Sequence, residues 1–219
     1  VVSSAASDVY KRQGITSFQA VNRIKKALGV KKIGHSGTLD PFATGVLAIA
    51  IGEATKSIEL FNKSKTYEFY VSFGELKDTD DITGKTIKTS KNIPTKKDIG
   101  SCINNFLFNY EQVPPNYSAV KVDGVRAYKL ARKKKEFSLK AKKVQISNMN
   151  FFETDKSNEF RFVADCSTGT YIRSIARDLG AMLDTYAYVK ELRRTKIGQI
   201  TEKDIILLDK FLELVHICL

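Results

Sequence analysis

The chain has little of what metal sites, disulfide frameworks and membrane anchors are built from. Its 219 residues include two histidines and three cysteines, and Cys102, Cys166 and Cys218 lie far apart with no Cys-X-X-Cys spacing. We therefore expect neither a disulfide framework nor a zinc site, and we expect reduced, buried cysteines. No apolar run approaches the roughly 20 residues of a membrane span, and residues 1–13 lack the apolar centre of a secretory signal. These absences favour a soluble, cytoplasmic globular protein.

Acidic residues are also scarce relative to basic ones. The 36 Lys and Arg residues against 24 Asp and Glu residues give a net charge of +12, which is typical of proteins that bind polyanions such as nucleic acid. Residues 129–143 carry eight basic residues and a single acid, Glu136. A solvated basic face without a ligand is one interpretation of this run. The overall basicity favours the other, contact with phosphates.

Apolar spacing and turn residues predict a mixture of helices and strands without internal repeats. Helices are expected at 18–28, capped by Ser17 and ending near Gly29, at about 170–183, and from near Thr201 onward. Strands are expected at 46–52, 66–74, 144–152 and 159–166, a hairpin at 121–128 and a loop at 34–46. Because no regular βαβ alternation exists, we expect an α+β fold with a mixed, mostly antiparallel central sheet flanked by helices.

Two segments resemble ligand-binding motifs but lack essential residues. Gly84-Lys85-Thr86 ends like a phosphate-binding loop, yet Thr79 stands where that motif needs its first glycine. Residues 78–81 begin like a calcium loop, but the sixth and twelfth positions are both threonines, at 83 and 89. Neither nucleoside triphosphate binding nor calcium binding is therefore predicted.

The segment GHSGTLDPFATGV, residues 34–46, presents the carboxylate of Asp40 on a shaped loop. Asp-Pro is a common start of a turn, so a purely structural role is one interpretation. Pro41 also keeps Asp40 out of helical conformation, and the neighbouring glycines allow sharp bends. A carboxylate held in this way can act as a nucleophile or general base if a cation keeps it ionised. His35 is either a polar residue bonded into the turn or a second member of this site.

Five segments together resemble the TruB-type tRNA pseudouridine synthases. They are GHSGTLDPFATGVL (34–47), KTYEFYVSFGELKDTDDITG (65–84), QVPPNYSAVKVDGVRAYKLAR (112–132), CSTGTYIRSIARDLG (166–180) and VKELRRTKIG (189–198). The resemblance extends from Gly14 to about Leu208 and implies a catalytic domain at 14–219. Residues 1–13, where the family usually has Lys-Pro, are expected to be poorly ordered or foreign to the fold. The small RNA-binding domain of the PUA type that follows in many members is expected to be absent or truncated.

The resemblance assigns roles to residues that match the family pattern. It implies that Asp40 is the catalytic aspartate, that Tyr67 stacks on the target base and takes part in proton transfer, and that Arg173 pairs with the aspartate. His35 is expected to fill the space vacated by the flipped uridine, and Leu192 to line the pocket. A basic insertion at about 125–145 is expected to grip the RNA. Further substrate contacts are expected from Lys121, Arg132, Lys133, Lys134 and Lys135.

The activity implied by the resemblance is isomerisation of uridine 55 in the T-loop of tRNA to pseudouridine. The base is flipped out, detached, rotated and rejoined to the ribose through carbon 5. No cofactor, metal or obligatory protein partner is implied. The alternatives are a non-catalytic RNA-binding or RNA-folding protein and a guide-RNA-dependent pseudouridine synthase subunit. A sugar-directed carboxylate hydrolase would need a second catalytic acid near the first.

Arg173 is unusual without any reference to a family. It falls in the first turn of a predicted helix, where the helix dipole disfavours a cation by about 0.3 to 1 kcal/mol. Pairing with Asp40 would offset this cost and keep that acid ionised. The alternative is a surface arginine whose charge pairs with Asp178 or is solvated by water.

Overall fold

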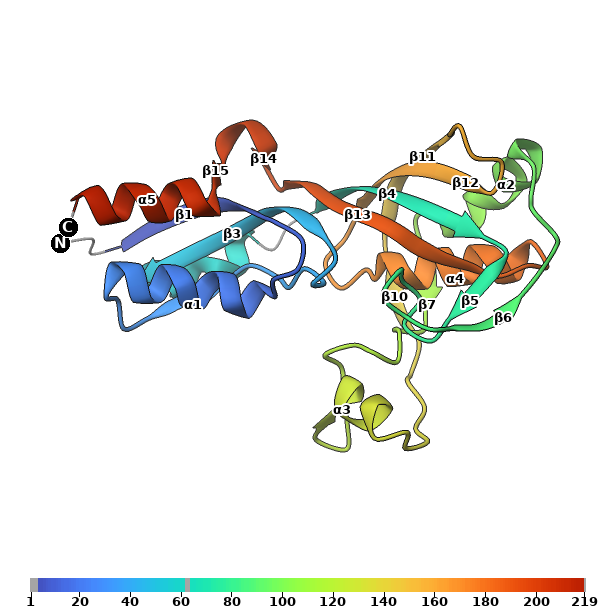
Figure 1. Ribbon diagram of the computed structural model, residues 1–219, viewed down its shortest axis with the longest axis horizontal. Coiled ribbons are helices and arrows are strands. Elements are labelled where there is room, and N and C mark those ends of the chain that lie inside the picture. The colour runs from blue at the N-terminus through green and yellow to red at the C-terminus, as the bar shows by residue number, and fades with distance from the viewer. Residues whose placement is uncertain (1–3, 62–63, 219) are drawn as a thin grey trace. The chain divides into compact units, whose positions relative to one another are not determined.

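The computed structural model describes residues 4–61 and 64–218 (Figure 1). The chain divides into two compact units: a first unit of residues up to 68 together with those from 192 onward, and a second unit of residues 69–191. Strands β4 (Lys65–Phe73) and β13 (Ala187–Ile197) contribute residues to both units. Among the described residues, no helix is both long and apolar enough to span a membrane.

The sheet of the first unit has the strand order β13-β3-β1-β15. Its strands are β1 (Ser4–Lys11), β2 (Ile33–His35), β3 (Thr44–Gly52), β14 (Ile200–Thr201) and β15 (Ile206–Leu207). Strands β1 and β2 run antiparallel to β3, whereas β13 runs parallel to β3 and β15 parallel to β1. The sheet is therefore mixed.

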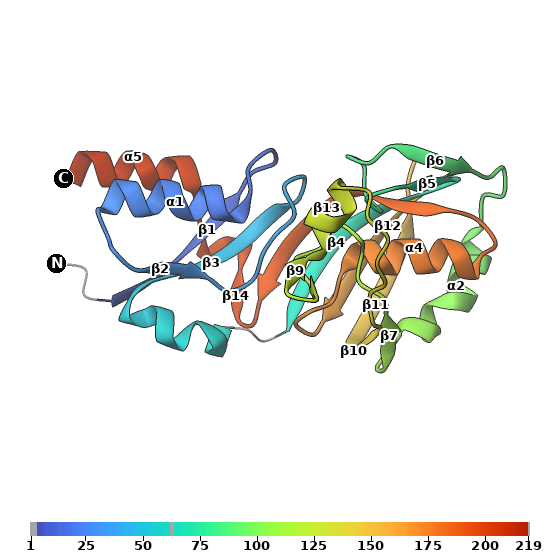
Figure 2. The ribbon, with the colours of Figure 1, turned by 90° about the horizontal axis from the view of Figure 1, so that it is seen from below.

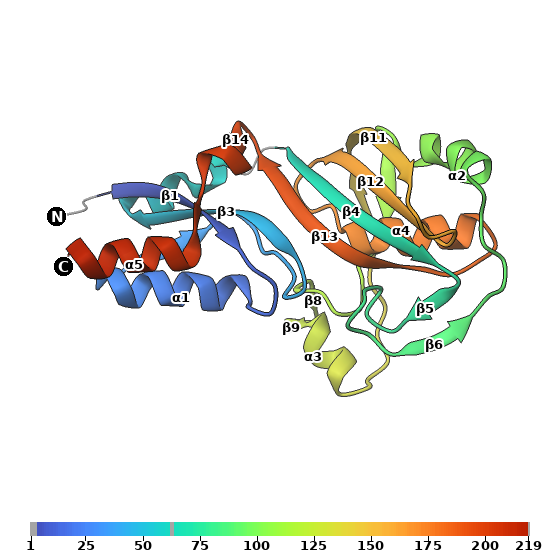
Figure 3. The same ribbon diagram turned by 45° about the horizontal axis from the view of Figure 1, so that its top comes forward.

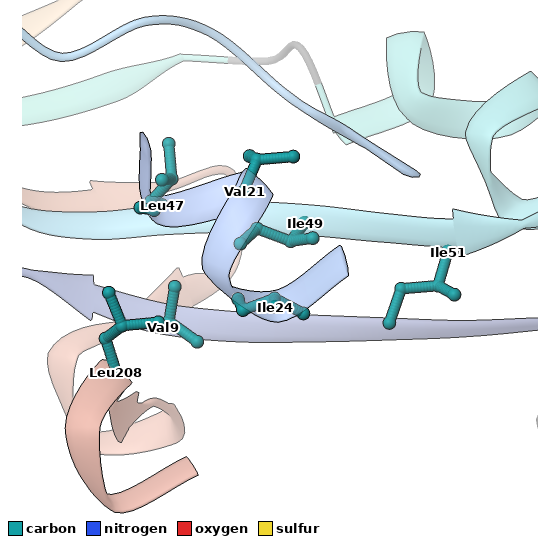
Figure 4. Close-up of a cluster of buried hydrophobic side chains, with 8 residues drawn as sticks. Val9, Val21, Ile24, Leu47, Ile49, Ile51 and Leu208 are labelled. Atoms are coloured by element: carbon teal, nitrogen blue, oxygen red, sulfur yellow. The ribbon is translucent and has the colours of Figure 1, made fainter. Parts of the chain in front are cut away.

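Helices cover this sheet and close the core of the first unit. Helices α1 (Ser17–Leu28) and α5 (Leu208–Cys218) lie side by side along one face, and the 3₁₀ helix η1 (Glu53–Phe61) packs against β2 and β3 (Figures 2 and 3). The short 3₁₀ helix η3 (Glu202–Asp204) connects β14 to β15. Alternate residues of β3 meet the apolar side of α1 in a buried cluster (Figure 4), whose labelled members are Val9, Val21, Ile24, Leu47, Ile49, Ile51 and Leu208. Burial of each such side chain contributes about 1.5 to 3 kcal/mol.

The first unit differs from the sequence predictions in four places. Residues 4–11 of the segment 1–13, expected to be poorly ordered or foreign, form strand β1, which pairs with β3 from Ser4↔Gly52 to Lys11↔Gly45, whereas residues 1–3 lie outside the described residues. Helix α1 is capped by Thr16 rather than Ser17, in a reciprocal capping box with Gln19. Strand β2 and the start of β3 lie inside the predicted loop, and the C-terminal helix begins at Leu208 rather than near Thr201.

The second unit is built on strands in the order β11-β12-β4-β13. Strands β11 (Ile146–Glu153) and β12 (Glu159–Cys166) are antiparallel. Three small antiparallel pairs join β5 (Glu75–Lys77) with β6 (Thr86–Thr89), β7 (Tyr110–Gln112) with β10 (Lys142–Val144), and β8 (Lys121–Val122) with β9 (Val125–Arg126). The helices are α2 (Lys96–Ile103), η2 (Asn104–Phe106), α3 (Ala127–Arg132) and α4 (Ile172–Met182).

Helix α4 lies against the strands of this unit and buries its apolar stripe (Figure 2). Aromatic rings pack on the sheet, where Phe69 and Phe162 stack with centroids 5.3 Å apart and Phe151 lies 6.0 Å from Phe162. The predicted strands at 66–74, 144–152 and 159–166 and the Asp123-Gly124 hairpin are confirmed within one or two residues. The predicted fold class, α+β with a mixed, mostly antiparallel sheet, is also confirmed.

Candidate active site

The loop that carries Asp40 connects β2 to β3 in the first unit. It turns inward on both sides of the acid, because Leu39 and Phe42 are buried while Asp40 itself is half-buried. The turn is closed by a hydrogen bond of 3.0 Å from the amide of Ala43 to the carbonyl of Asp40. The loop is thus anchored by apolar side chains and leaves the carboxylate between them.

Two buried cationic side chains hold the backbone carbonyls of this loop. Lys11 is 0% exposed and donates to the carbonyls of Pro41 (3.3 Å) and Ala43 (2.7 Å). Arg194 is 1% exposed and donates to the carbonyls of Gly37 (3.2 Å) and Thr38 (3.4 Å). Its Nε also donates to the carbonyl of Val46, at 2.9 Å. Because buried charges are costly unless they are hydrogen-bonded, these contacts fix both the cations and the loop.

Gly45 allows strand β13 to bring Arg194 under the loop. Gly45 pairs with Arg194 in the parallel β3–β13 ladder and has a φ of +112°. A Cβ at this position would lie 2.1 Å from the carbonyl oxygen of Arg194. Only glycine fits both the conformation and the close approach, so Gly45 has a structural role in the segment 34–46.

A third buried cation, Lys65, lies beside the same loop. Its Nζ would be 3.3 Å from a Cβ built on Gly37. Burial lowers the pKa of both Lys11 and Lys65 from 10.5 to about 8; the charge of Arg194 adds to this effect, and the charge of Asp40 opposes it at Lys11. The charge of Asp40 is therefore opposed by that of Lys11, a cation of its own unit.

These lowered lysine pKa values predict a pH-dependent stability. Between pH 8 and 10.5 these lysines are protonated in the unfolded chain but largely neutral in the folded chain. Burying the charged lysines lowers the free energy of unfolding, and this loss is complete below pH 8. The free energy of unfolding therefore rises as the pH increases from 8 to 10.5. Relative to Lys65→Met, the parent should gain unfolding free energy between pH 7 and pH 9.5, as measured by urea denaturation. The exposed control Lys25→Met should show a constant difference from the parent. A constant difference for Lys65→Met would contradict the lowered pKa.

The other predicted site residues of the first unit lie on strands. Tyr67 is on β4 and Leu192 is on β13, and both side chains are buried. His35 ends β2 and is half-buried, and its Nδ1 has no hydrogen-bond partner within residues 4–61 and 64–218. Burial lowers the pKa of His35, which favours the neutral imidazole. The first unit therefore carries Asp40, Tyr67, His35 and Leu192.

Arg173 belongs to the second unit and is not a surface residue. It is 4% exposed in the first turn of α4 and donates to the carbonyls of Thr79 and Tyr117, both at 3.1 Å. Its guanidinium also lies 3.6 Å from the carboxylate of Asp81. The alternative of a surface arginine that pairs with Asp178 or solvent is wrong, because the side chain is buried and its partners are Thr79, Tyr117 and Asp81. These acceptors also offset the unfavourable helix dipole. The pairing with Asp40 stays a prediction.

Arg177, one turn further along α4, also has several hydrogen-bond acceptors. It donates to Asp80 (3.2 Å), Asp178 (2.9 Å) and the carbonyl of Val113 (2.7 Å). Burial raises the pKa of Asp80 to about 6, against the opposing charge of Arg177. Two of the acids that resemble a calcium loop, Asp80 and Asp81, thus face arginines, whereas Asp78 accepts a hydrogen bond from the amide of Lys85. In the described part of the chain, no three His, Cys, Asp or Glu side chains group as a metal site requires.

The basic residues predicted to contact RNA are exposed on the second unit. Helix α3 and the segments on either side extend away from the strands of this unit (Figure 1). Lys121 and Arg132 are exposed, as are the three lysines at 133–135. Arg132 stacks over Tyr128, at 5.5 Å from the ring centroid. None of these five residues forms an ion pair with another residue of the described ranges, so their charges are available to a polyanion.

Comparison with known proteins identifies the class of this fold. In the crystal structure of a Cbf5-Nop10-Gar1 complex, one chain is 26% identical and superposes with a TM-score of 0.73, over 95% of this chain and 53% of that one. A chain in the structure of an H/ACA RNP bound to a substrate RNA containing 2'-deoxyuridine superposes with a TM-score of 0.71 at 23% identity, over 95% and 52%. The α+β fold is that of a pseudouridine synthase, an isomerase.

Sequence comparison is more specific. A family model described as "TruB family pseudouridylate synthase (N terminal domain)" matches residues 25–172, and one described as "tRNA pseudouridylate synthase B C-terminal domain" matches residues 173–218. The tRNA pseudouridine synthase B of Ehrlichia ruminantium (strain Gardel) is 46% identical over 95% of this chain and 71% of its own length. That of Rickettsia bellii (strain OSU 85-389) is 45% identical, over 97% and 73%. The chain belongs to the TruB family of pseudouridylate synthases.

Proposed function

We propose that the chain converts uridine 55 in the T-loop of tRNA to pseudouridine, with Asp40 as the attacking carboxylate. The supporting observation is the loop of Asp40, whose backbone carbonyls are held by the buried cations Lys11 and Arg194. An acid fixed in this way needs little reorganisation when it attacks, and the nearby positive charge of Lys11 attracts its anionic form. Relatives at 45% and 46% identity carry the name tRNA pseudouridine synthase B, which favours tRNA as the substrate.

The remaining residues have roles that suit a flipped base. A uridine inside a folded loop must leave its stack before its glycosidic bond can be reached. Tyr67 offers an aromatic face for stacking and a hydroxyl for proton transfer, and Leu192 offers an apolar wall. Neutral His35 takes the place left by the base, and Arg173 keeps Asp40 ionised and aimed. Attack on the ribose and attack on the base are both open to Asp40 in this scheme.

The exposed lysines of the second unit are proposed to bind the phosphates of the T-arm. Replacing Lys133, Lys134 and Lys135 together by alanine should weaken binding to T-arm RNA. The dependence of log K on log salt concentration should become shallower by roughly 0.7 to 0.9 for each phosphate that the variant no longer binds. Binding titrations at several salt concentrations measure this slope.

A matched control removes the same charge elsewhere. Lys25, Lys26 and Lys31 are exposed on the first unit, and their triple alanine variant should keep the slope of the parent. If the two triple variants have equal slopes, the segment around α3 has no specific role in RNA binding.

The function is tested by mapping the product. An unmodified tRNA transcript is incubated with the protein alone, and pseudouridine is located by carbodiimide modification and primer extension. The proposal expects modification at position 55 and its loss when that uridine is replaced by cytidine. Binding without product would favour the non-catalytic RNA-binding alternative. Product only with an added guide RNA and protein partners would favour the guide-dependent alternative.

A further inference from the structure

Ser17 is not the helix cap that its sequence position suggests, because its side chain turns into the protein. It is the first residue of α1 and is 2% exposed. Its Oγ accepts a hydrogen bond from the amide of Leu39 at 2.9 Å and donates one to the carbonyl of Leu39 at 3.2 Å. One hydroxyl therefore satisfies both backbone groups of the residue that precedes Asp40.

No strand supplies partners for these backbone groups. Strand β2 ends at His35 and β3 begins at Thr44, so Leu39 lies between the ladders of the sheet. Leu39 is 2% exposed, which also keeps water from its backbone. Within the described ranges, Ser17 is the hydrogen-bond partner of both groups.

The two hydrogen bonds determine how the backbone enters Asp40. The carbonyl of Leu39 and the amide of Asp40 form one planar peptide group, and the amide of Leu39 belongs to the preceding group. Fixing both groups fixes the direction of the N–Cα bond of Asp40. The amide of Ala43 holds the carbonyl of Asp40 at 3.0 Å on the other side, and the two constraints together set the direction of the Cα–Cβ bond. Arg194 holds the carbonyl of Thr38 on one side, and Lys11 holds that of Pro41 on the other. Ser17 thus acts on the residue that directly precedes Asp40.

We propose that Ser17 is a positioning residue for pseudouridine formation. Its hydroxyl locks the two peptide groups before Asp40, so that the carboxylate starts from the geometry of attack. This assignment rests on the proposed function, in which Asp40 is the attacking group. It concerns the rate of the chemical step and not RNA binding, because Ser17 is buried and offers the RNA no surface.

The test is Ser17→Ala, which removes both hydrogen bonds with little change in volume. A displacement of a reacting group by about 1 Å can cost about 100-fold in rate. We expect the single-turnover rate with pre-bound T-arm RNA to fall at least tenfold while the Kd for the RNA changes less than twofold. Ser17→Cys keeps a similar shape but has only a weak hydrogen-bonding thiol. It should show the same split, and it serves as the deciding variant if Ser17→Ala does not fold.

Thr16→Ala is the matched control. Thr16 is the true cap of α1, so its loss should lower the melting temperature without changing the rate by more than twofold. If Ser17→Ala and Ser17→Cys are no slower than Thr16→Ala, Ser17 is only a packing residue and the assignment is overturned. A parent chain that makes no pseudouridine would instead overturn the proposed function, and this assignment with it.

Discussion

Asp40→Asn is expected to abolish pseudouridine formation while leaving the fold and RNA binding intact. The amide has the shape of the carboxylate and can still form hydrogen bonds, but it lacks the negative charge needed for attack. The loop should keep its conformation, since its anchors are the backbone contacts of Lys11, Arg194 and Ser17. The single-turnover rate should therefore fall far more than tenfold, with an unchanged Kd for T-arm RNA.

The control for this variant is Asp155→Asn, which makes the same change at an exposed acid of the β11–β12 turn. It should retain the full rate. Residual activity of Asp40→Asn above roughly a tenth of the parent would contradict the role of Asp40 as the attacking group, because loss of a nucleophile costs much more than that.

Arg173→Lys is expected to have the second largest effect. The guanidinium of Arg173 reaches the carbonyls of Thr79 and Tyr117 and also lies near Asp81. A lysine keeps the charge but has no planar fork, so it cannot serve these acceptors together and still aim at a carboxylate. We expect a loss of rate of about 10- to 100-fold with little change in RNA affinity, measured by the same single-turnover assay.

The choice of control for Arg173 depends on the structure. Arg177, one turn further along the same helix, is the nearest arginine in sequence, but it has three acceptors of its own and is therefore unsuitable as a control. Arg161→Lys on β12 is a better match, since its guanidinium lies over the ring of Phe152, 4.4 Å from the centroid. If Arg173→Lys retains the rate of Arg161→Lys, Arg173 has no special part in the reaction.

The elements that the sequence predicted well are those determined by local pattern. Strand β4 alternates buried and less buried residues from Lys65 to Val71, and the Asp123-Gly124 turn has the two positive φ values that its residues favour. Strand β1 was missed because its Ser/Ala-rich sequence has no such alternation, and its pairing with β3 is distant in sequence. Thr16 and Ser17 are both good caps. The hydrogen bonds of Ser17 to the backbone of Leu39 leave Thr16 as the cap, and the neighbouring sequence does not indicate this contact.

The candidate site was predictable only in part for the same reason. Asp40 could be found because Pro41 and the nearby glycines mark its loop. Arg194 could not be found from the sequence, since its hydrogen bond to the carbonyl of Val46 joins residues 148 positions apart. Lys65 did leave a signal: it falls on the buried side of β4, two positions before Tyr67, where a charged residue is unusual and indicates a specific environment. The role of Asp81 beside Arg173 was hidden by its resemblance to a calcium loop.

Tritium release from T-arm RNA with uridine labelled at carbon 5 tests the central claim most directly. Joining carbon 5 to the ribose expels the hydrogen of that carbon, so each conversion releases one tritium to water. The protein, without added metal, guide RNA or partner, should release tritium up to one equivalent per RNA, and Asp40→Asn should release almost none. RNA that binds tightly to the parent protein without releasing tritium would contradict the account.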